Sequence, residues 1–183
     1  LASEWETSAR KVREALNGLS IPAHFLFPAN EFPDSHCVYD VCLRFISEDG
    51  RRIAIAARMG PESRRGEVEC FRRSFVDGIM WHEWHELPKG RMEFGDAILV
   101  PGRRLCLLGA RQNDAGLCVR SDDDGREALR ECLLRFGIES LIVPFDGSRE
   151  NGRLHLTTAM SFVGMVEGVP TLLINPRAVK CVE

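Results

Sequence analysis

Apolar residues along the chain follow two spacings, one typical of helices and one of strands. From Glu4 to Leu19 they follow a helical spacing that ends at Gly18, which predicts an amphipathic first helix. Further helices are predicted after an N-cap at Ser63 and at Gly125–Phe136, behind an acidic run. Strands are predicted at Ala23–Phe27, Val38–Ile46, Arg52–Ala57, Trp81–Leu87, Asp96–Val100, Arg104–Gly109, Glu139–Val143, Leu156–Phe162 and Thr171–Ile174.

The predicted elements repeat in order, because three hairpins follow one another with a helix and a further strand between them. Cys37, Glu93 and His155 occupy like positions just before the three hairpins. Repeated units place such positions equivalently, so these side chains are expected to face one centre. The pattern predicts an α/β fold in which ββαβ repeats form a propeller-like ring around a central cavity, with residues 1–183 as a single domain of about three full repeats plus partial ones.

Composition narrows the class of protein. The 183 residues are 44% apolar and 28% charged, which is typical of a globular domain with a sizeable core. A net charge of -3 with scattered basic pairs gives no electrostatic reason to expect nucleic acid or an anionic membrane as a partner. Seven singly spaced cysteines are more typical of a reducing compartment than of a disulfide framework, so a cytoplasmic protein is expected.

Five segments in chain order resemble motifs of the dimethylargininase and amidinotransferase branch of the pentein superfamily. The resemblance implies the pentein α/β-propeller, incomplete at both ends in this chain, and an enzyme that modifies guanidino groups. The segments are Phe32-Pro33-Asp34-Ser35 with Val38-Tyr39-Asp40, Gly60 to Val68 (Gly-Pro-Glu-Ser-Arg-Arg-Gly-Glu-Val), Met92-Glu93-Phe94-Gly95-Asp96, Gly109-Ala110-Arg111-Gln112-Asn113, and Leu154-His155-Leu156.

Roles for individual residues follow from this resemblance. Glu93 and Asp40 would bind the planar guanidinium, for which carboxylates are suited, and His155 would move protons at the reacting group. The substrate's α-carboxylate is assigned to Arg64 and Arg111, and polar contacts to Asp34. Asp96 is expected instead to hold backbone N–H groups.

Two residues depart from the family pattern, since Tyr39 stands where an acidic residue is expected and Phe94 where a glycine is expected. The nucleophilic cysteine of the family is expected in polypeptide missing from this chain, and Cys37 is an alternative nucleophile. No cofactor is expected, because the sequence has no phosphate-binding loop and no dinucleotide fingerprint. No metal site is expected either, because strand-like alternation sends His82 and His85 to opposite faces.

The leading hypothesis is hydrolysis of arginine or an N-substituted arginine to citrulline and an amine, through a cysteine thiouronium intermediate. Transfer of the amidino group to an amine acceptor is a close variant. A non-catalytic pentein that binds a ligand in the same pocket is the alternative from another class. A small guanidino compound is the expected partner, and association with a second copy or with a complementary chain is also considered.

Overall fold

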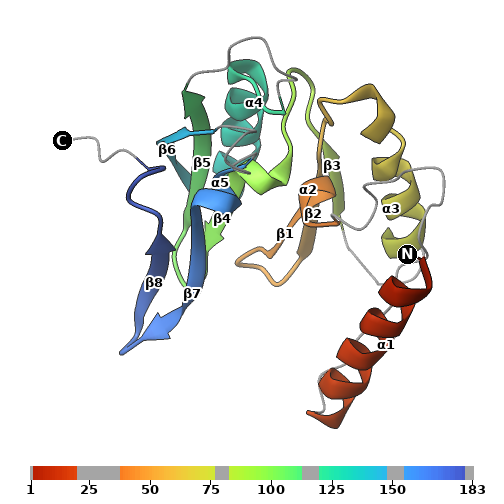
Figure 1. The fold of residues 1–183 in the computed structure, drawn as a ribbon. Coiled ribbons are helices and arrows are strands. Elements are labelled where there is room, and N and C mark those ends of the chain that lie inside the picture. Colours follow the sequence, from red (N-terminus) through yellow and green to blue (C-terminus); the bar gives the residue numbers. More distant parts are fainter. Residues whose placement is uncertain (1, 20–37, 77–82, 113–119, 148–154, 180–183) are drawn as a thin grey trace.

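A computed structural model of the chain describes residues 2–19, 38–76, 83–112, 120–147 and 155–179 (Figure 1). The described residues form a mixed α/β structure with helices beside three small sheets. In chain order the elements are α1 (Ala2–Gly18), α2 (Val38–Val41), β1 (Cys42–Ile46), β2 (Arg52–Ala56), η1 (Glu62–Arg64), α3 (Glu67–Val76), β3 (Glu83–Glu86), η2 (Phe94–Asp96), β4 (Ala97–Val100), β5 (Leu105–Gln112), α4 (Asp123–Leu134), β6 (Glu139–Asp146), α5 (Leu156–Ala159), β7 (Met160–Val166) and β8 (Val169–Ile174).

The repeat predicted from the sequence is present in the sheets. The first sheet has the order β1-β2-β3, an antiparallel hairpin followed by a parallel third strand. The second sheet, β4-β5-β6, has the same plan, and β7 pairs with β8 as a third antiparallel hairpin. The parallel third strand is reached in each case through a helix, α3 or α4, as expected for a crossover connection.

Each hairpin begins with a short helical turn, where the sequence pattern predicted strand for all of α2 and α5 and for Asp96 of η2. These turns are α2, η2 and α5, and both α2 and α5 contact η2. The backbone bonds locally there, with the N–H of Asp96 donating to Glu93 and the N–H of Thr158 to His155, each at 3.0 Å. Apolar alternation over so few residues does not distinguish a turn from a strand start. The three turns bring the starts of the three units together.

Of two helix starts predicted from the sequence, one is wrong and one is confirmed. Ser63 lies in η1, and helix α3 begins at Glu67, so the predicted N-cap is wrong. Asp122 caps α4, because its side chain accepts the N–H of Gly125 at 2.8 Å. The predicted strand Ala23–Phe27 lies outside the described residues.

Three clusters of buried apolar side chains hold these elements together. The largest joins β2, β4 and β5 to the inner face of α4. A second lies between the β4-β5-β6 sheet, α5 and β7, and a third packs Phe71 of α3 against Val41 and Ala54. Both faces of the β4-β5-β6 sheet are therefore used in packing, which fixes η2 between its neighbours.

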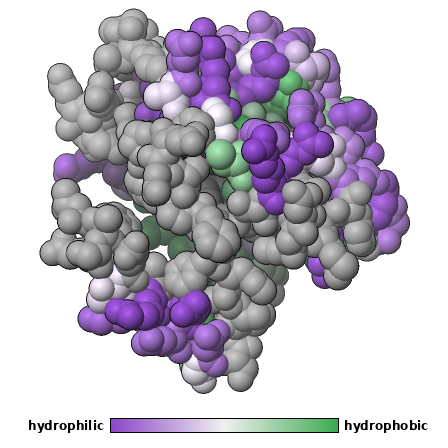
Figure 2. Space-filling model, turned by 90° about the vertical axis from the view of Figure 1, so that its right-hand side faces the viewer, coloured by the Kyte–Doolittle hydropathy of each residue, from purple (hydrophilic) through white to green (hydrophobic). Residues whose placement is uncertain are grey.

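The surface is mixed in character. On the face seen in Figure 2 the described side chains are mainly hydrophilic. Exposed apolar side chains are found on β6, β7 and β8, including Leu141, Val163 and Leu173. No helix in the described part of the chain is both long and apolar enough to cross a membrane.

Candidate active site

Asp40, Glu93 and His155 meet where the three helical turns converge. Asp40 lies in α2, Glu93 directly precedes η2, and His155 directly precedes α5. The Nε2 atom of His155 is 3.5 Å from Oε2 of Glu93 and 3.8 Å from Oδ2 of Asp40. Glu93 and His155 lie far apart in the sequence, and both are buried. The sequence prediction that Glu93 and His155 face one centre therefore describes their geometry correctly.

Arg64 joins the same cluster from η1. Its side chain is 3% exposed, and its Nη1 lies 3.1 Å from Oδ2 of Asp40 and 3.1 Å from Oε2 of Glu93. Its Nη2 donates to Glu67 at 2.9 Å. Burial lowers the pKa of Arg64, but its bonds to Glu67 and Asp40 outweigh burial and raise the pKa above its ordinary value. Arg64 thus contacts protein carboxylates, and the substrate carboxylate assigned to it stays a prediction.

Arg120 and Ser121 also belong to the site, and sequence reasoning missed both. The Nη1 atom of Arg120 lies 3.1 Å from Oε2 of Glu93. The hydroxyl of Ser121 accepts the N–H of Glu93 at 3.2 Å and donates to Oδ2 of Asp96 at 2.7 Å. These two residues come just before α4, outside every motif quoted above, so no sequence signal selected them.

Asp96 links the second turn to the third. Its Oδ1 accepts the N–H of Leu156 at 2.9 Å, which confirms the prediction that Asp96 holds a backbone N–H group. The same oxygen lies 3.4 Å from Nδ1 of His155. Asp96 therefore contacts both the imidazole of His155 and the backbone at the start of α5.

The protonation states in the cluster are shifted by burial and by neighbouring charge. Burial raises the pKa of Glu93, while Arg120, His155 and Arg64 act in the opposite direction. Burial lowers the pKa of His155, but Asp96, Asp40 and Glu93 outweigh it and raise this pKa above its ordinary value of 6.5. His155 therefore holds its proton to higher pH in the folded protein than in the unfolded chain.

This shift predicts a pH dependence of stability. Because the folded pKa of His155 is raised, its stabilising contribution is complete below pH 6.5 and is lost as the pH rises through the folded value. The free energy of unfolding, measured by urea denaturation between about pH 5 and 8, is expected to fall with rising pH more steeply than in a His155→Gln variant. Parallel curves for the two proteins would contradict the shift.

The three central side chains also satisfy the distance criterion for a metal site. One donor atom each from Asp40, Glu93 and His155 lie within 4.8 Å of one another. Arg64 and Arg120 are bonded to these carboxylates, however, and their positive charges oppose a divalent cation at the same place. The distances alone therefore do not make this cluster a metal site.

The remaining predicted site residues are Arg111, Asp34 and Cys37. Arg111 is in β5, opposite Phe145 of β6, and packs against Gly147. Asp34 and Cys37 lie outside the described residues. The described part of the chain contains four cysteines, and in two of the buried ones, Cys42 and Cys106, burial raises the pKa of the thiol to about 12. These two thiols are therefore unsuited to nucleophilic attack.

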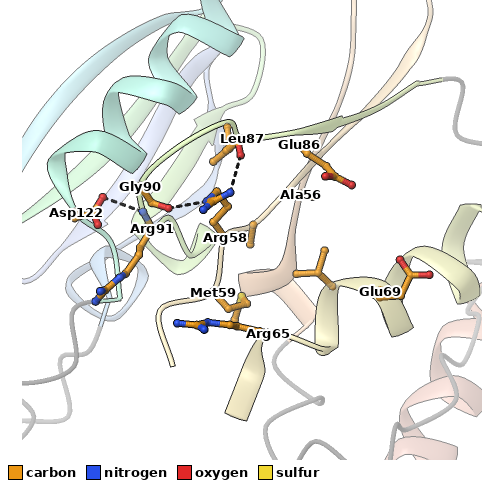
Figure 3. Close-up of a pocket in the computed structure, with 12 residues that line it drawn as sticks. Ala56, Arg58, Met59, Arg65, Glu69, Glu86, Leu87, Gly90, Arg91 and Asp122 are labelled. Carbon is orange, nitrogen blue, oxygen red and sulfur yellow. Dashed lines mark hydrogen bonds between the residues drawn. The ribbon is translucent and has the colours of Figure 1, made fainter. Parts of the chain in front are cut away.

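A separate cavity of about 600 Å³ lies between α3 and the start of α4 (Figure 3). Arg58 enters it with its guanidinium bonded to the carbonyls of Gly90 and Leu87. Arg65 and Glu69 line the α3 side. Its charges are mixed, and neither Glu93 nor His155 lines it, so it is distinct from the cluster around the imidazole.

Comparison with known proteins gives the relatives of the chain. No family model matches it. An uncharacterized protein of Aeropyrum pernix is 31% identical over 153 residues, which are 82% of this chain and 48% of that protein. The chain thus spans about half the length of this relative.

Solved structures of two guanidino-modifying enzymes share the fold. DDAH from Pseudomonas aeruginosa, in a cysteine-to-serine variant complexed with citrulline, is 26% identical with a TM-score of 0.58, over 74% of this chain and 46% of that one. The N-terminal domain of ArgZ, an arginine dihydrolase from the ornithine-ammonia cycle in cyanobacteria, was solved with its substrate. It is 20% identical with a TM-score of 0.70, over 94% of this chain and 56% of that one. The resemblance seen in the sequence is confirmed, and the chain has the fold of the pentein superfamily of guanidino-modifying enzymes.

Proposed function

We propose that this chain forms the guanidine-binding half of a hydrolase that converts arginine or an N-substituted arginine to citrulline and an amine. The observation that carries the proposal is the charge of the cluster around His155. Four carboxylates meet there, and two arginines contact them. Even with the imidazole protonated, the four carboxylates outnumber the three cations, and a bound guanidinium would neutralise the remaining negative charge. The carboxylates are those of Asp40, Glu67, Glu93 and Asp96.

Geometry supports the choice of a planar cation. Oδ2 of Asp40 and Oε2 of Glu93 both face Nε2 of His155. A guanidinium presents several N–H donors in one plane, so it can bond to both carboxylates with its central carbon beside the imidazole. Arg64 would then orient the two carboxylates from the protein side, and Arg111 would bind the substrate carboxylate.

The proposed reaction uses a thiolate from polypeptide that this chain does not include, and Cys37, which lies outside the described residues, is the alternative nucleophile. The thiolate forms a bond to the guanidinium carbon, and the resulting tetrahedral species loses the amine, which takes a proton from His155. Water then gives a proton to His155 as it attacks the thiouronium carbon. The adduct then collapses: its carbon–sulfur bond breaks, its hydroxyl gives the remaining proton to solvent, and citrulline and the thiolate are released.

Citrulline release by the full-length polypeptide tests this function. With arginine and N-methylated arginines as substrates, a His155→Ala variant is expected to lose at least about 100-fold in turnover, because the leaving amine then lacks its proton donor. His85→Ala is the matched control, since His85 lies on β3 beside Glu83 and is expected to retain full turnover. Equal citrulline release by His155→Ala and the native protein would rule the proposal out.

The non-catalytic alternative is favoured by one observation, the high thiol pKa of the buried Cys42 and Cys106. If the alternative holds, titration calorimetry of the same polypeptide detects arginine binding that a Glu93→Gln variant weakens, while no citrulline forms. Formation of a new guanidino compound only when an amine is added would indicate amidino transfer instead.

A further inference from the structure

We infer that Asp96 holds the imidazole of His155 with its proton on Nδ1, which leaves Nε2 as the atom that accepts and returns protons. Asp96 is thus a positioning residue, which acts through His155. The use of Nε2 in guanidine hydrolysis rests on the proposed function, but the state of the imidazole does not.

The two imidazole nitrogens face different kinds of carboxylate. Nε2 faces Glu93 and Asp40, and each of these already accepts a bond from the guanidinium of Arg64. Arg120 adds a second cation to Glu93. Much of the negative charge on that side is therefore neutralised by arginine.

Asp96 differs because, within the described part of the chain, the groups that donate hydrogen bonds to it are neutral. Oδ1 accepts the backbone N–H of Leu156, and Oδ2 accepts the hydroxyl of Ser121. Its charge is therefore more available to an imidazole N–H than the charges of Glu93 and Asp40 are. These two bonds also tie Asp96 to the start of α5, next to the ring it faces.

The Nδ1 atom needs such a partner. It is buried and has no hydrogen bond of ordinary geometry among the described residues, while Oδ1 of Asp96 lies 3.4 Å away. A buried polar nitrogen without a partner is costly, and a small rotation of the ring toward Asp96 would satisfy it. The raised pKa of His155, to which Asp96 contributes, agrees with this geometry.

The chain of contacts extends to Glu93. The Ser121 hydroxyl accepts the N–H of Glu93, so its own proton is directed to Asp96. The carboxylate proposed to bind the guanidinium and the imidazole proposed to move the proton are thereby held by one network. Ser121 sets the orientation of Asp96 without carrying charge.

Nitrogen-15 NMR of the native protein is the first test. Neutral His155 is expected to show a protonated Nδ1 and an unprotonated Nε2, and its resonances are identified by their absence in His155→Gln. A proton on Nε2 in the neutral ring would overturn the inference without any variant of Asp96.

Asp96→Asn is the second test, because asparagine keeps the shape and an acceptor for Leu156 but removes the charge. Loss of the Nδ1–H signature and a lower titration midpoint for His155 are expected. Asp124→Asn, a charge change on the exposed part of α4, is the control and is expected to leave the signature in place. If Asp96→Asn changes stability but neither the tautomer nor the midpoint, Asp96 has only a structural role and the inference fails.

Both tests measure the protonation of the His155 imidazole itself and do not depend on catalysis. A protein without citrulline release but with the expected tautomer would disprove the proposed function and leave the inference on Asp96 standing. Citrulline release by a protein whose neutral His155 carries its proton on Nε2 would support the proposed function and disprove the inference on Asp96.

Discussion

Replacing Arg64 with methionine is expected to lower the free energy of unfolding by about 3–5 kcal/mol, the cost of breaking a buried ion pair from one side. Arg64 is 3% exposed and is bonded to Asp40, Glu67 and Glu93. Methionine fills a similar volume but leaves the three carboxylates without this cation. Urea denaturation at neutral pH, analysed as a two-state transition, measures the loss.

Arg65→Met is the matched control, because this neighbouring arginine is exposed and lines the cavity in Figure 3. Its effect is expected to stay within about 0.5 kcal/mol. A destabilisation of equal size in both variants would mean that the carboxylate cluster does not depend on Arg64. Acidic conditions give a second check, since protonated carboxylates no longer need the guanidinium and the difference between the variants should shrink.

Most of the fold was predictable from the sequence because long periodic segments carry strong signals. The 17-residue helix α1 and the 12-residue helix α4 were found from their spacing and their end signals. The hairpin plan was found from the order of strands and turns. The helical turns α2, η2 and α5 were not found, because four or fewer residues are too short for a period to emerge.

The site was predictable where residue type and repeat agreed. Glu93 and His155 precede equivalent turns, so the repeat alone placed them at one centre. Arg120 and Ser121 were missed because their roles depend on how the chain returns to Glu93, which is a tertiary contact with no local pattern. The burial of Arg64 could not be predicted from the sequence either, because adjacent arginines are usually exposed to solvent.

Gly95 shows how closely the first and third turns approach the second. A Cβ atom added there would lie 2.6 Å from Oδ1 of Asp40 and 2.6 Å from Cγ of His155. Real side-chain contacts are not this short, so any larger residue must displace one of the two functional groups. The glycine is thus required by the convergence of the turns rather than by its own backbone conformation.

Gly95→Ala is therefore expected to cost about 1–3 kcal/mol of unfolding free energy through overpacking. The added methyl group must displace Asp40 or His155 from its position in the site. Citrulline release is therefore expected to fall by about 100-fold as well. Gly18→Ala is the control, since an added Cβ at the last residue of α1 meets nothing within 4 Å. If Gly95→Ala retained native turnover and stability, Asp40 and His155 would not be held against η2 as closely as the structure shows, and the geometry on which the proposed function rests would be wrong.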